Sequence, residues 1–374
     1  MSGSSTPTRH DRILGALLGV HAGDSLGATV EFESWEDIRG RFPDGVRDII
    51  GGGILGWEPG HATDDTDLTR AVLLAYRDVR TFKPRGSGAY STPPDVVKIA
   101  AQNMVDWYDG RWPGRPRGQR PVDVGGATAT GLHRFKQTND PRTSGAGQGR
   151  AGNGSLMRCI PTALFQPDAD LALGESMAIS AITHDDLDCT IACAAYNAVV
   201  RALVDGKPPE EAWQAGKAAV ERAAVLAAAS ASGSSTESRQ VTAQVSRAAE
   251  KVAAALDAGK TLVQVQDLAV NGPQNAANAA EVLPHRASGY VLESLILAVA
   301  ALFDPRPLEE VLIDVVRFGK DTDTNGAIAG GLLGARDGVD AIPLRWREKL
   351  QFGREFAEVV EQMLSPQEDG TQGS

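Results

Sequence analysis

Residues 60–67 read GHATDDTD and place three carboxylates and two threonine hydroxyls within five residues, directly before an apolar run. From Leu68 onward, apolar residues recur at the spacing of one amphipathic helix face, through Val72 and Val79. One carboxylate is enough to cap a helix start, whereas adjacent Asp64 and Asp65 repel each other unless a cation lies between them. We therefore favour a site for a hard divalent cation, held by carboxylate and hydroxyl oxygens, over simple helix capping.

A second segment repeats this arrangement far downstream. Residues 319–326 read GKDTDTNG and again set alternating Asp and Thr before a helix, whose small face we expect to contain Ile328, Gly331, Leu332 and Ala335. Two such clusters at helix starts could converge on one site. The alternative is a calcium loop of the EF-hand kind, but its twelfth position should be a bidentate Glu and here it is Leu332.

Composition narrows the class of protein. The chain has 374 residues, 42% of them apolar, which is ample for a buried core. A net charge of −11 argues against a dedicated nucleic-acid or anionic-membrane surface. Three cysteines, two of them one helical turn apart at Cys189 and Cys193, fit reduced buried thiols rather than disulfides or a zinc site. We see no secretory segment and no apolar run of the roughly eighteen residues that span a membrane, so we expect a cytoplasmic protein.

The N-terminal part of the chain predicts a helix with one smooth side. Ile13, Leu17 and Val20 form its apolar stripe, and glycines recur every fourth residue from position 15 to 27, so another backbone can lie close against it. Asp24 and Glu31 at its end need a partner or a cation, because acidic groups among apolar neighbours are costly to bury. The alternative for Asp24 is that it caps a neighbouring backbone. Residues 1–10 read as a disordered polar leader, 11–364 as a single domain, and 365–374 as a polar tail.

The remaining pattern predicts an all-α protein of a dozen or more helices, because period-two runs of β-branched residues are almost absent. The expected helices include residues 95–108, 123–135, 171–182, 189–204, 210–229 and 241–256. Glycine, proline and serine mark loops at 49–57, 83–94 and 110–120, and a flexible polar hairpin at 230–238. We expect the 110–120 loop to be a mobile surface loop whose arginines could serve only solubility.

Residues 151–161 read AGNGSLMRCIP and offer bare backbone N–H groups at a helix start, a common geometry for phosphate binding. The segment lacks both the G-x-G-x-x-G spacing and the Walker motif, and a plain loop-to-helix turn is the alternative. His184 lies at a helix junction, where a cap or surface role is commoner than a ligand role. The alternative for Tyr290 is core packing with its hydroxyl satisfied.

Taken together, these segments resemble the ADP-ribosylglycohydrolases of the dinitrogenase reductase-activating type. The resemblance spans Ile13 to about Ala335 and is carried, in the family's order, by GDSLG at 23–27 with Glu31, TDDT at 63–66, DVG at 123–125, GNG at 152–154 with Met157 and Arg158, TH at 183–184, SGY at 288–290 and DTDT at 321–324. It implies an all-α orthogonal multi-helix bundle. It also implies a hydrolase that acts on ADP-ribose linked through its anomeric carbon to a protein side chain.

The resemblance further implies a binuclear centre of two divalent cations, Mg²⁺ or Mn²⁺. Its ligands would be Glu31, Thr63, Asp64, Asp65, Asp321, Asp323 and Thr324. Glu31, Asp65 and Asp123 would be the catalytic carboxylates, and the general acid or base could be Glu31 or Asp123. The substrate would contact Gly125, Gly152, Asn153, Gly154, Ser155, His184, Ser288, Gly289 and Tyr290, with the pyrophosphate on the 152–155 backbone.

The implied partner is an ADP-ribosylated protein or ADP-ribose derivative, bound by a monomer without membrane or nucleic acid. The scissile linkage stays open among arginine, serine, another side chain, a nucleic-acid base and O-acetyl-ADP-ribose. A catalytically inactive ADP-ribose-binding or toxin-neutralising protein is the alternative function. An unrelated metal-dependent phosphohydrolase is a further one.

Overall fold

The computed structural model describes residues 6–82, 94–229, 236–262, 265–272 and 283–366. Within these ranges the chain forms sixteen α-helices, one 3-10 turn and no strand, which confirms the all-α prediction. The helices of the first half are α1 (Arg9–Gly27), α2 (Trp35–Arg41), α3 (Asp64–Thr81), α4 (Val96–Tyr108), α5 (Gly126–Thr138), α6 (Ile160–Phe165), α7 (Ala169–Ala181) and α8 (Leu187–Val204). Those of the second half are α9 (Pro209–Ala229), α10 (Thr236–Thr261), α11 (Val265–Asn271), α13 (Val291–Phe303), α14 (Leu308–Arg317), α15 (Thr322–Asp337), α16 (Leu344–Arg347) and α17 (Gly353–Leu364).

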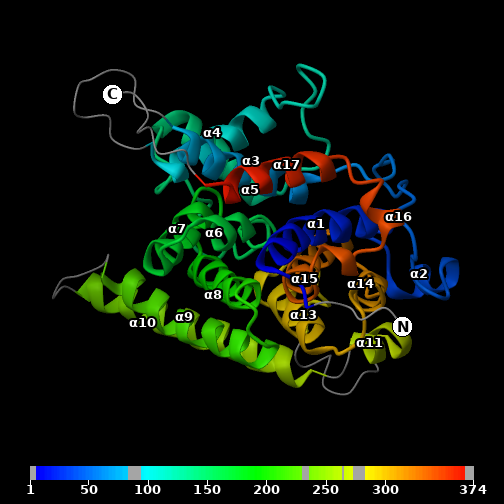
Figure 1. Ribbon diagram of the computed structural model, residues 1–374. Helices are drawn as coiled ribbons and strands as arrows, with labels where there is room; N and C mark the ends of the chain where they lie inside the picture. The colour runs from blue at the N-terminus through cyan, green and yellow to red at the C-terminus, as the bar shows by residue number, and fades with distance from the viewer. Residues whose placement is uncertain (1–5, 83–93, 230–235, 263–264, 273–282, 367–374) are drawn as a thin grey trace.

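Helices α1 and α15 lie side by side at the centre of the bundle (Figure 1). Their backbones touch through glycine: a Cβ on Gly15 would lie 2.5 Å from the carbonyl oxygen of Gly334, and one on Gly326 would lie 2.6 Å from that of Gly23. The predicted close approach to α1 is therefore confirmed. The face of α15 that meets α1 carries Gly326, Gly330 and Gly334, and the small face that we expected through Ile328 and Gly331 lies beside it.

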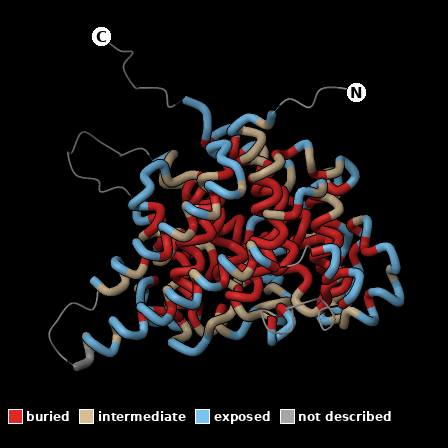
Figure 2. Tube along the Cα trace, turned by 90° about the horizontal axis from the view of Figure 1, so that it is seen from below, coloured by how far each residue is buried: buried red, intermediate tan, exposed pale blue. Residues whose placement is uncertain are grey.

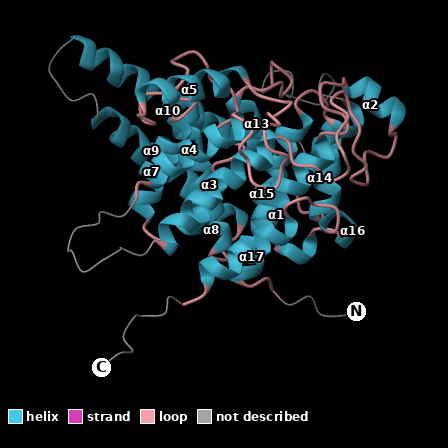
Figure 3. Cartoon of the chain, turned by 90° about the horizontal axis from the view of Figure 1, so that it is seen from above, coloured by secondary structure: helices cyan, strands magenta, loops and turns pink. Residues whose placement is uncertain are grey.

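The other face of α15 packs on α8. The hydroxyl of Tyr196 donates to the carbonyl of Ile328 at 2.8 Å, and it lies where a Cβ on Gly331 would point. Around this pair, buried residues fill the interior of the bundle and exposed residues cover its outside (Figure 2). The connecting loops gather near the ends of α13 and α15 and beside α2 (Figure 3), so the helices form a frame on which loop residues can be placed.

Helix α8 is long and apolar enough to cross a membrane, judged by length and composition alone. Our expectation that no apolar run is long enough was therefore wrong. In the structure 78% of that helix is buried inside the protein, which is the behaviour of a core helix. Cys189 and Cys193 lie on it, and all three cysteines are buried and free, as predicted.

Several boundaries differ from the expected ones. Thr8 caps α1 by accepting a hydrogen bond from the Asp11 N–H, so Arg9 and His10 are helical and the predicted leader over 1–10 was too long. The loop at 83–94 and the hairpin at 230–238 lie almost wholly outside the described residues. The described end of that hairpin belongs to α10, which begins at Thr236.

Candidate metal centre

Two segments that are distant in sequence are tied together beside the site. Phe32 donates its backbone N–H to the carbonyl of Lys320 at 2.7 Å, and Lys320 donates to the carbonyl of Glu33 at 2.8 Å. Both Phe32 and Lys320 have left-handed backbones, with φ of 66° and 67°. Residues other than glycine rarely adopt this backbone conformation unless the surrounding structure enforces it, and here the two paired loops do so. The pairing places Glu31, after α1, next to Asp321, at the start of α15.

Three carboxylates from separate parts of the chain meet at this point. One oxygen each from Glu31, Asp123 and Asp323 lies within 4.8 Å of the others. Glu31 follows α1, Asp123 precedes α5, and Asp323 is in the first turn of α15. An all-oxygen set of this kind suits hard divalent cations. Sequence reasoning placed Glu31 and Asp323 among the metal ligands and gave Asp123 a catalytic role.

The two Asp/Thr segments meet at Asp65. The hydroxyls of Thr63 and Thr324 both donate to its Oδ2, at 3.2 and 3.3 Å. Asp24 lies beneath them and accepts from the backbone of Thr63 and Thr66, each at 3.2 Å. The starts of α3 and α15 thus converge, and the positive ends of both helix dipoles favour negative charge between them.

Three oxygens in this cluster have no donor within the described part of the chain. They are Oδ1 of Asp24, Oε2 of Glu31 and Oδ1 of Asp65, and all three are buried. A buried carboxylate oxygen without a hydrogen bond is costly unless it is protonated or meets a cation. The residues present therefore fit an oxygen-ligated cation.

The raised pKa values of the cluster's carboxyl groups also favour a bound cation. Burial raises the pKa of Asp24 to about 7, and burial together with Asp123, Asp321 and Asp24 raises the pKa of Glu31 to about 8. The pKa values of Asp64, Asp65, Asp123, Asp321 and Asp323 are also raised, first by burial and, except at Asp321, also by neighbouring carboxylates. Without a cation, several of these groups would hold protons near neutral pH.

The glycine-flanked segment reaches the Asp321 end of the cluster. Asn153 donates its side-chain amide to Asp321 at 2.7 Å and to Ser294 at 3.0 Å. Its backbone N–H donates to the carbonyl of Gly289 at 3.0 Å, so the 152–155 and 288–290 segments lie side by side. The Asn153 side chain thus holds the Asp321 carboxylate, and its backbone N–H is bonded to Gly289, so the substrate contact expected of Asn153 stays a prediction.

His184 lies beneath the same segment. It is buried, which excludes a surface role among the alternatives considered for it, and a Cβ on Gly154 would lie 2.9 Å from its Cε1. Its Nδ1 shares a hydrogen bond of 2.7 Å with the Thr183 hydroxyl, and burial lowers its pKa to about 3. The neutral His184 ring therefore packs against the backbone of Gly154.

The remaining expected substrate contacts lie at the edge of the site. Tyr290 is half-buried, donates its hydroxyl to Asp188 at 3.0 Å, and lines a cavity of about 500 Å³ with Arg247 and Lys251. Its hydroxyl is satisfied, as the packing alternative requires. Gly125, before α5, and Ser288 are exposed, and the Ser288 hydroxyl donates to the carbonyl of His285.

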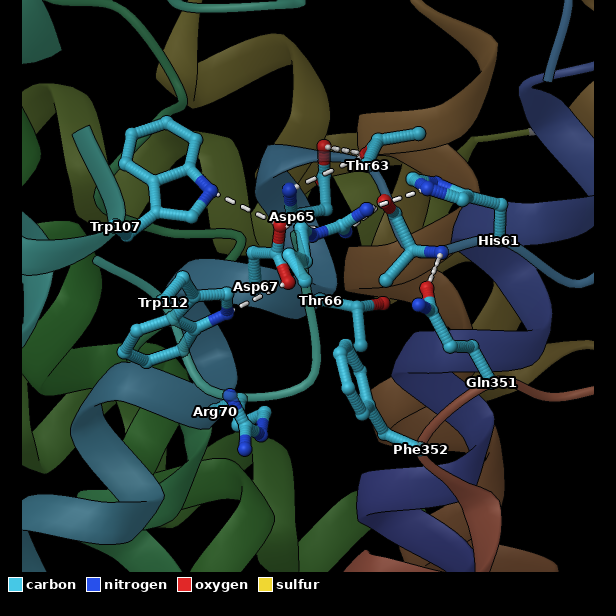
Figure 4. A network of polar contacts seen from close by, with 12 residues as sticks. His61, Thr63, Asp65, Thr66, Asp67, Arg70, Trp107, Trp112, Gln351 and Phe352 are labelled. Atoms are coloured by element: carbon cyan, nitrogen blue, oxygen red, sulfur yellow. Dashed lines mark hydrogen bonds and ion pairs between the residues drawn. The ribbon is translucent and has the colours of Figure 1, made fainter. Parts of the chain in front are cut away.

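Sequence reasoning missed a buried network beside the cluster (Figure 4). Asp67 accepts from the indole N–H groups of Trp107 and Trp112 at 2.9 and 3.0 Å, and from Arg115 at 2.7 Å. Arg115 also donates to the carbonyl of Ala62 at 2.8 Å and to Nε2 of His61. We considered that the arginines of the 110–120 loop could serve only solubility, and the buried contacts of Arg115 exclude that alternative for this residue. The available signal was Asp67 itself, a third carboxylate in an apolar helix.

The sequence is similar to those of known enzymes over nearly its whole length. The profile of the ADP-ribosylglycohydrolase family matches residues 5–372. The chain is 29% identical to the ADP-ribosyl-[dinitrogen reductase] glycohydrolase of Rhodospirillum rubrum, over 96% of this chain and 97% of that one. It is 25% identical to the ADP-ribosylarginine hydrolase Tri1 of Pseudomonas putida (strain GB-1), over 96% of this chain and 80% of that one.

A solved structure agrees with these relatives. It is described as an ADP-ribosylglycohydrolase-related protein complex, and it matches with a TM-score of 0.62 and 27% identity over 95% of this chain and 97% of its own. The expected orthogonal bundle of this family is therefore confirmed.

Proposed function

The chain belongs to the ADP-ribosylglycohydrolase family, and from that premise we propose that it releases ADP-ribose from a modified protein side chain with the help of two divalent cations, Mg²⁺ or Mn²⁺. As a member of this family it is a hydrolase. The need for cations is supported by the close approach of the Glu31, Asp123 and Asp323 carboxylates. Buried carboxylate oxygens without a hydrogen-bond donor lie beside them.

The residues that would hold the cations come from both Asp/Thr segments and from the loop after α1. They are Glu31, Thr63, Asp64, Asp65, Asp321, Asp323 and Thr324. Bound divalent cations would hold the ribose hydroxyls and polarise the anomeric centre. Asn153 would keep Asp321 in place, because its amide donates to that carboxylate.

Glu31 and Asp123 divide the proton transfers in this proposal. Glu31 would take a proton from the attacking water at Oε2, the carboxylate oxygen that lacks a donor. Asp123 would give a proton to the departing side chain as the bond to the anomeric carbon breaks. Asp123 suits this role because it lines a cavity beside the cluster.

The pyrophosphate would rest on the backbone of Gly152, Gly154 and Ser155, over the neutral ring of His184. Tyr290, Ser288, Gly289 and Gly125 would border the rest of ADP-ribose. The names of the relatives support an ADP-ribosylated protein as the substrate of this chain too. We place its action in the cytoplasm, in line with three free cysteines, and as a monomer.

The test is incubation of the protein with two peptides of one sequence, ADP-ribosylated on arginine or on serine, with Mg²⁺ or with chelator. Release of ADP-ribose from at least one peptide, dependent on the cation, is the expected result. Tight binding of free ADP-ribose without any release would instead favour an inactive binding or toxin-neutralising protein. Release that chelator leaves unchanged would contradict the cation part.

A further inference from the structure

A small cavity opens at one end of the acidic cluster. It has a volume of about 180 Å³, and its lining includes Thr63, Asp64 and Asp123 of the site together with Trp57 and Glu58. Neither the 152–155 segment nor Asp321 contributes to it. The glycine segment contacts the Asp321 end of the cluster through Asn153. The cavity and the proposed pyrophosphate site therefore contact the cluster through different residues.

The size of the cavity suits a single side chain. Pockets that bury whole small-molecule ligands are typically roughly 300–1,000 Å³, so this one is too small for a nucleoside diphosphate. With the ribose on the cluster and the pyrophosphate on the glycine segment, the substituent at the anomeric carbon would point toward this end. That substituent is the side chain from which ADP-ribose is released.

One wall of the cavity is built in advance. The rings of Trp57 and His61 stack with their centroids 5.0 Å apart. Arg115 holds this wall by donating to His61 and to the carbonyl of Ala62, and Asp67 holds Arg115. A preformed wall lowers the ordering cost of binding a side chain.

The charges of the lining select among side chains. Asp64 and Asp123 belong to the cluster, and Asp67 is paired with Arg115, so Glu58 and Arg120 are the charged lining residues outside those groups. Both are exposed. A serine or carboxylate side chain is neutral once linked to ADP-ribose, whereas a linked guanidinium keeps its positive charge. Only the guanidinium gains from a carboxylate, and the adjacent Trp57 ring also suits a cation.

We infer that this cavity receives the leaving side chain and that Glu58 makes it selective for a guanidinium over a neutral side chain. The inference rests on the proposed function and names its substrate class. Val122, which lines the cavity, and Ile54, next to the lining residue Leu55, are exposed apolar residues that would meet the backbone of the modified protein.

The test compares kcat and KM for the two ADP-ribosylated peptides in four proteins: the parent, Glu58→Gln, Arg120→Gln and Glu221→Gln. Glu221 is an exposed carboxylate on α9, away from the cavity lining. Glu58→Gln should raise KM for the arginine-linked peptide about fivefold, with kcat nearly unchanged, because an exposed ion pair contributes modestly. KM for the serine-linked peptide should stay as in the parent.

Arg120→Gln removes the opposite charge from the same lining, so it should leave KM for the arginine-linked peptide unchanged or lower it. Glu221→Gln should match the parent for both peptides. Equal KM values for Glu58→Gln and parent, or a parent that prefers the serine-linked peptide, would overturn the selectivity of the cavity while leaving the proposed function standing. If the parent releases ADP-ribose from neither peptide, the proposed function is wrong and this inference falls with it.

Discussion

Arg115 donates to Asp67 at 2.7 Å across 48 residues of chain, and both side chains are at least nine-tenths buried. Burial raises the pKa of Asp67, and Arg115 with the two indole N–H groups favours its charged form. The buried, charged form of Asp67 therefore depends on the hydrogen bonds from Arg115 and both indoles. It fixes the 110–120 loop to α3, one residue beyond the Thr63–Thr66 segment of the acidic cluster.

Removing the guanidinium of Arg115 should lower the free energy of unfolding. Arg115→Met leaves Asp67 buried with two neutral donors, and we expect a loss of about 3 kcal/mol of unfolding free energy. Arg117→Met, an exposed position in the same loop, should change it by less than about 0.5 kcal/mol. Urea unfolding of both variants measures the difference. Equal midpoints for the two would show that the Asp67 network contributes no stability.

The contact between α1 and α15 predicts a strong dependence on glycine. A Cβ on Gly19 would overlap the carbonyl oxygen of Gly330, so Gly19→Ala should destabilise the protein by at least about 3 kcal/mol. Gly40, exposed in α2, has open space around its Cα, and Gly40→Ala should stabilise by up to about 1 kcal/mol. Denaturant unfolding tests both signs. A Gly19→Ala protein as stable as the parent would contradict the close packing.

His21 gives the protein a specific sensitivity to acid. It accepts the Phe352 N–H at Nε2 at 3.3 Å and contacts Ser25 at Nδ1, and burial lowers its pKa to about 3. Because the unfolded chain takes up a proton below about pH 6.5 and the folded one does not, His21 favours folding above that pH. This contribution is lost as the pH falls toward 3.

Between pH 7 and pH 5 the loss from His21 should be about 2 kcal/mol. The acidic cluster changes stability in the opposite direction over this range, since its pKa values are raised, so the parent must be compared with a variant. His21→Gln should lack this part of the pH dependence. Unfolding curves at both pH values check it, and parallel pH dependence in parent and variant would contradict a neutral His21.

The glycine segment should be sensitive to any side chain. Gly154→Ala places a Cβ 2.9 Å from the His184 ring and on the backbone proposed to approach the pyrophosphate. We expect the dissociation constant of free ADP-ribose to rise at least tenfold while cation binding is unchanged. Calorimetry with ADP-ribose measures this, with Gly40→Ala as the matched control. Unchanged affinity in Gly154→Ala would return this segment to a plain loop-to-helix turn.

Much of the frame followed from local pattern. Apolar periodicity placed α4 and α8 within two residues of their observed starts, and the glycines of α1 predicted a close neighbour. The identity of that neighbour, through Gly326 and Gly330, depends on how distant helices pair. Small residues of α15 also lie on a second face, through Ile328. The sequence of this helix alone therefore could not show which of the two faces meets α1.

The site shows the same division. The acidic residues at helix starts could be found because their local repulsion is visible in the sequence. Asp123 joins Glu31 and Asp323 through a loop, and Arg115 reaches Asp67 from a segment whose proline and glycine content indicates only an irregular chain. The burial of His184 depends on what covers it, which a single residue at a helix junction does not reveal.

We propose that the Thr63–Asp65 and Asp321–Thr324 segments form one cation site, and thermal unfolding with and without cation is the sharpest test of this site. Cations that bind only the folded chain should add about 2.7 kcal/mol per independent site at about a hundred times their dissociation constant. Chelator should therefore lower the melting temperature of the parent, and millimolar Mn²⁺ or Mg²⁺ should restore it. Asp323→Asn, which keeps size and removes charge, should narrow the difference while remaining folded. A parent that melts at the same temperature in chelator and in millimolar Mn²⁺, and binds no cation in titration, would contradict the account.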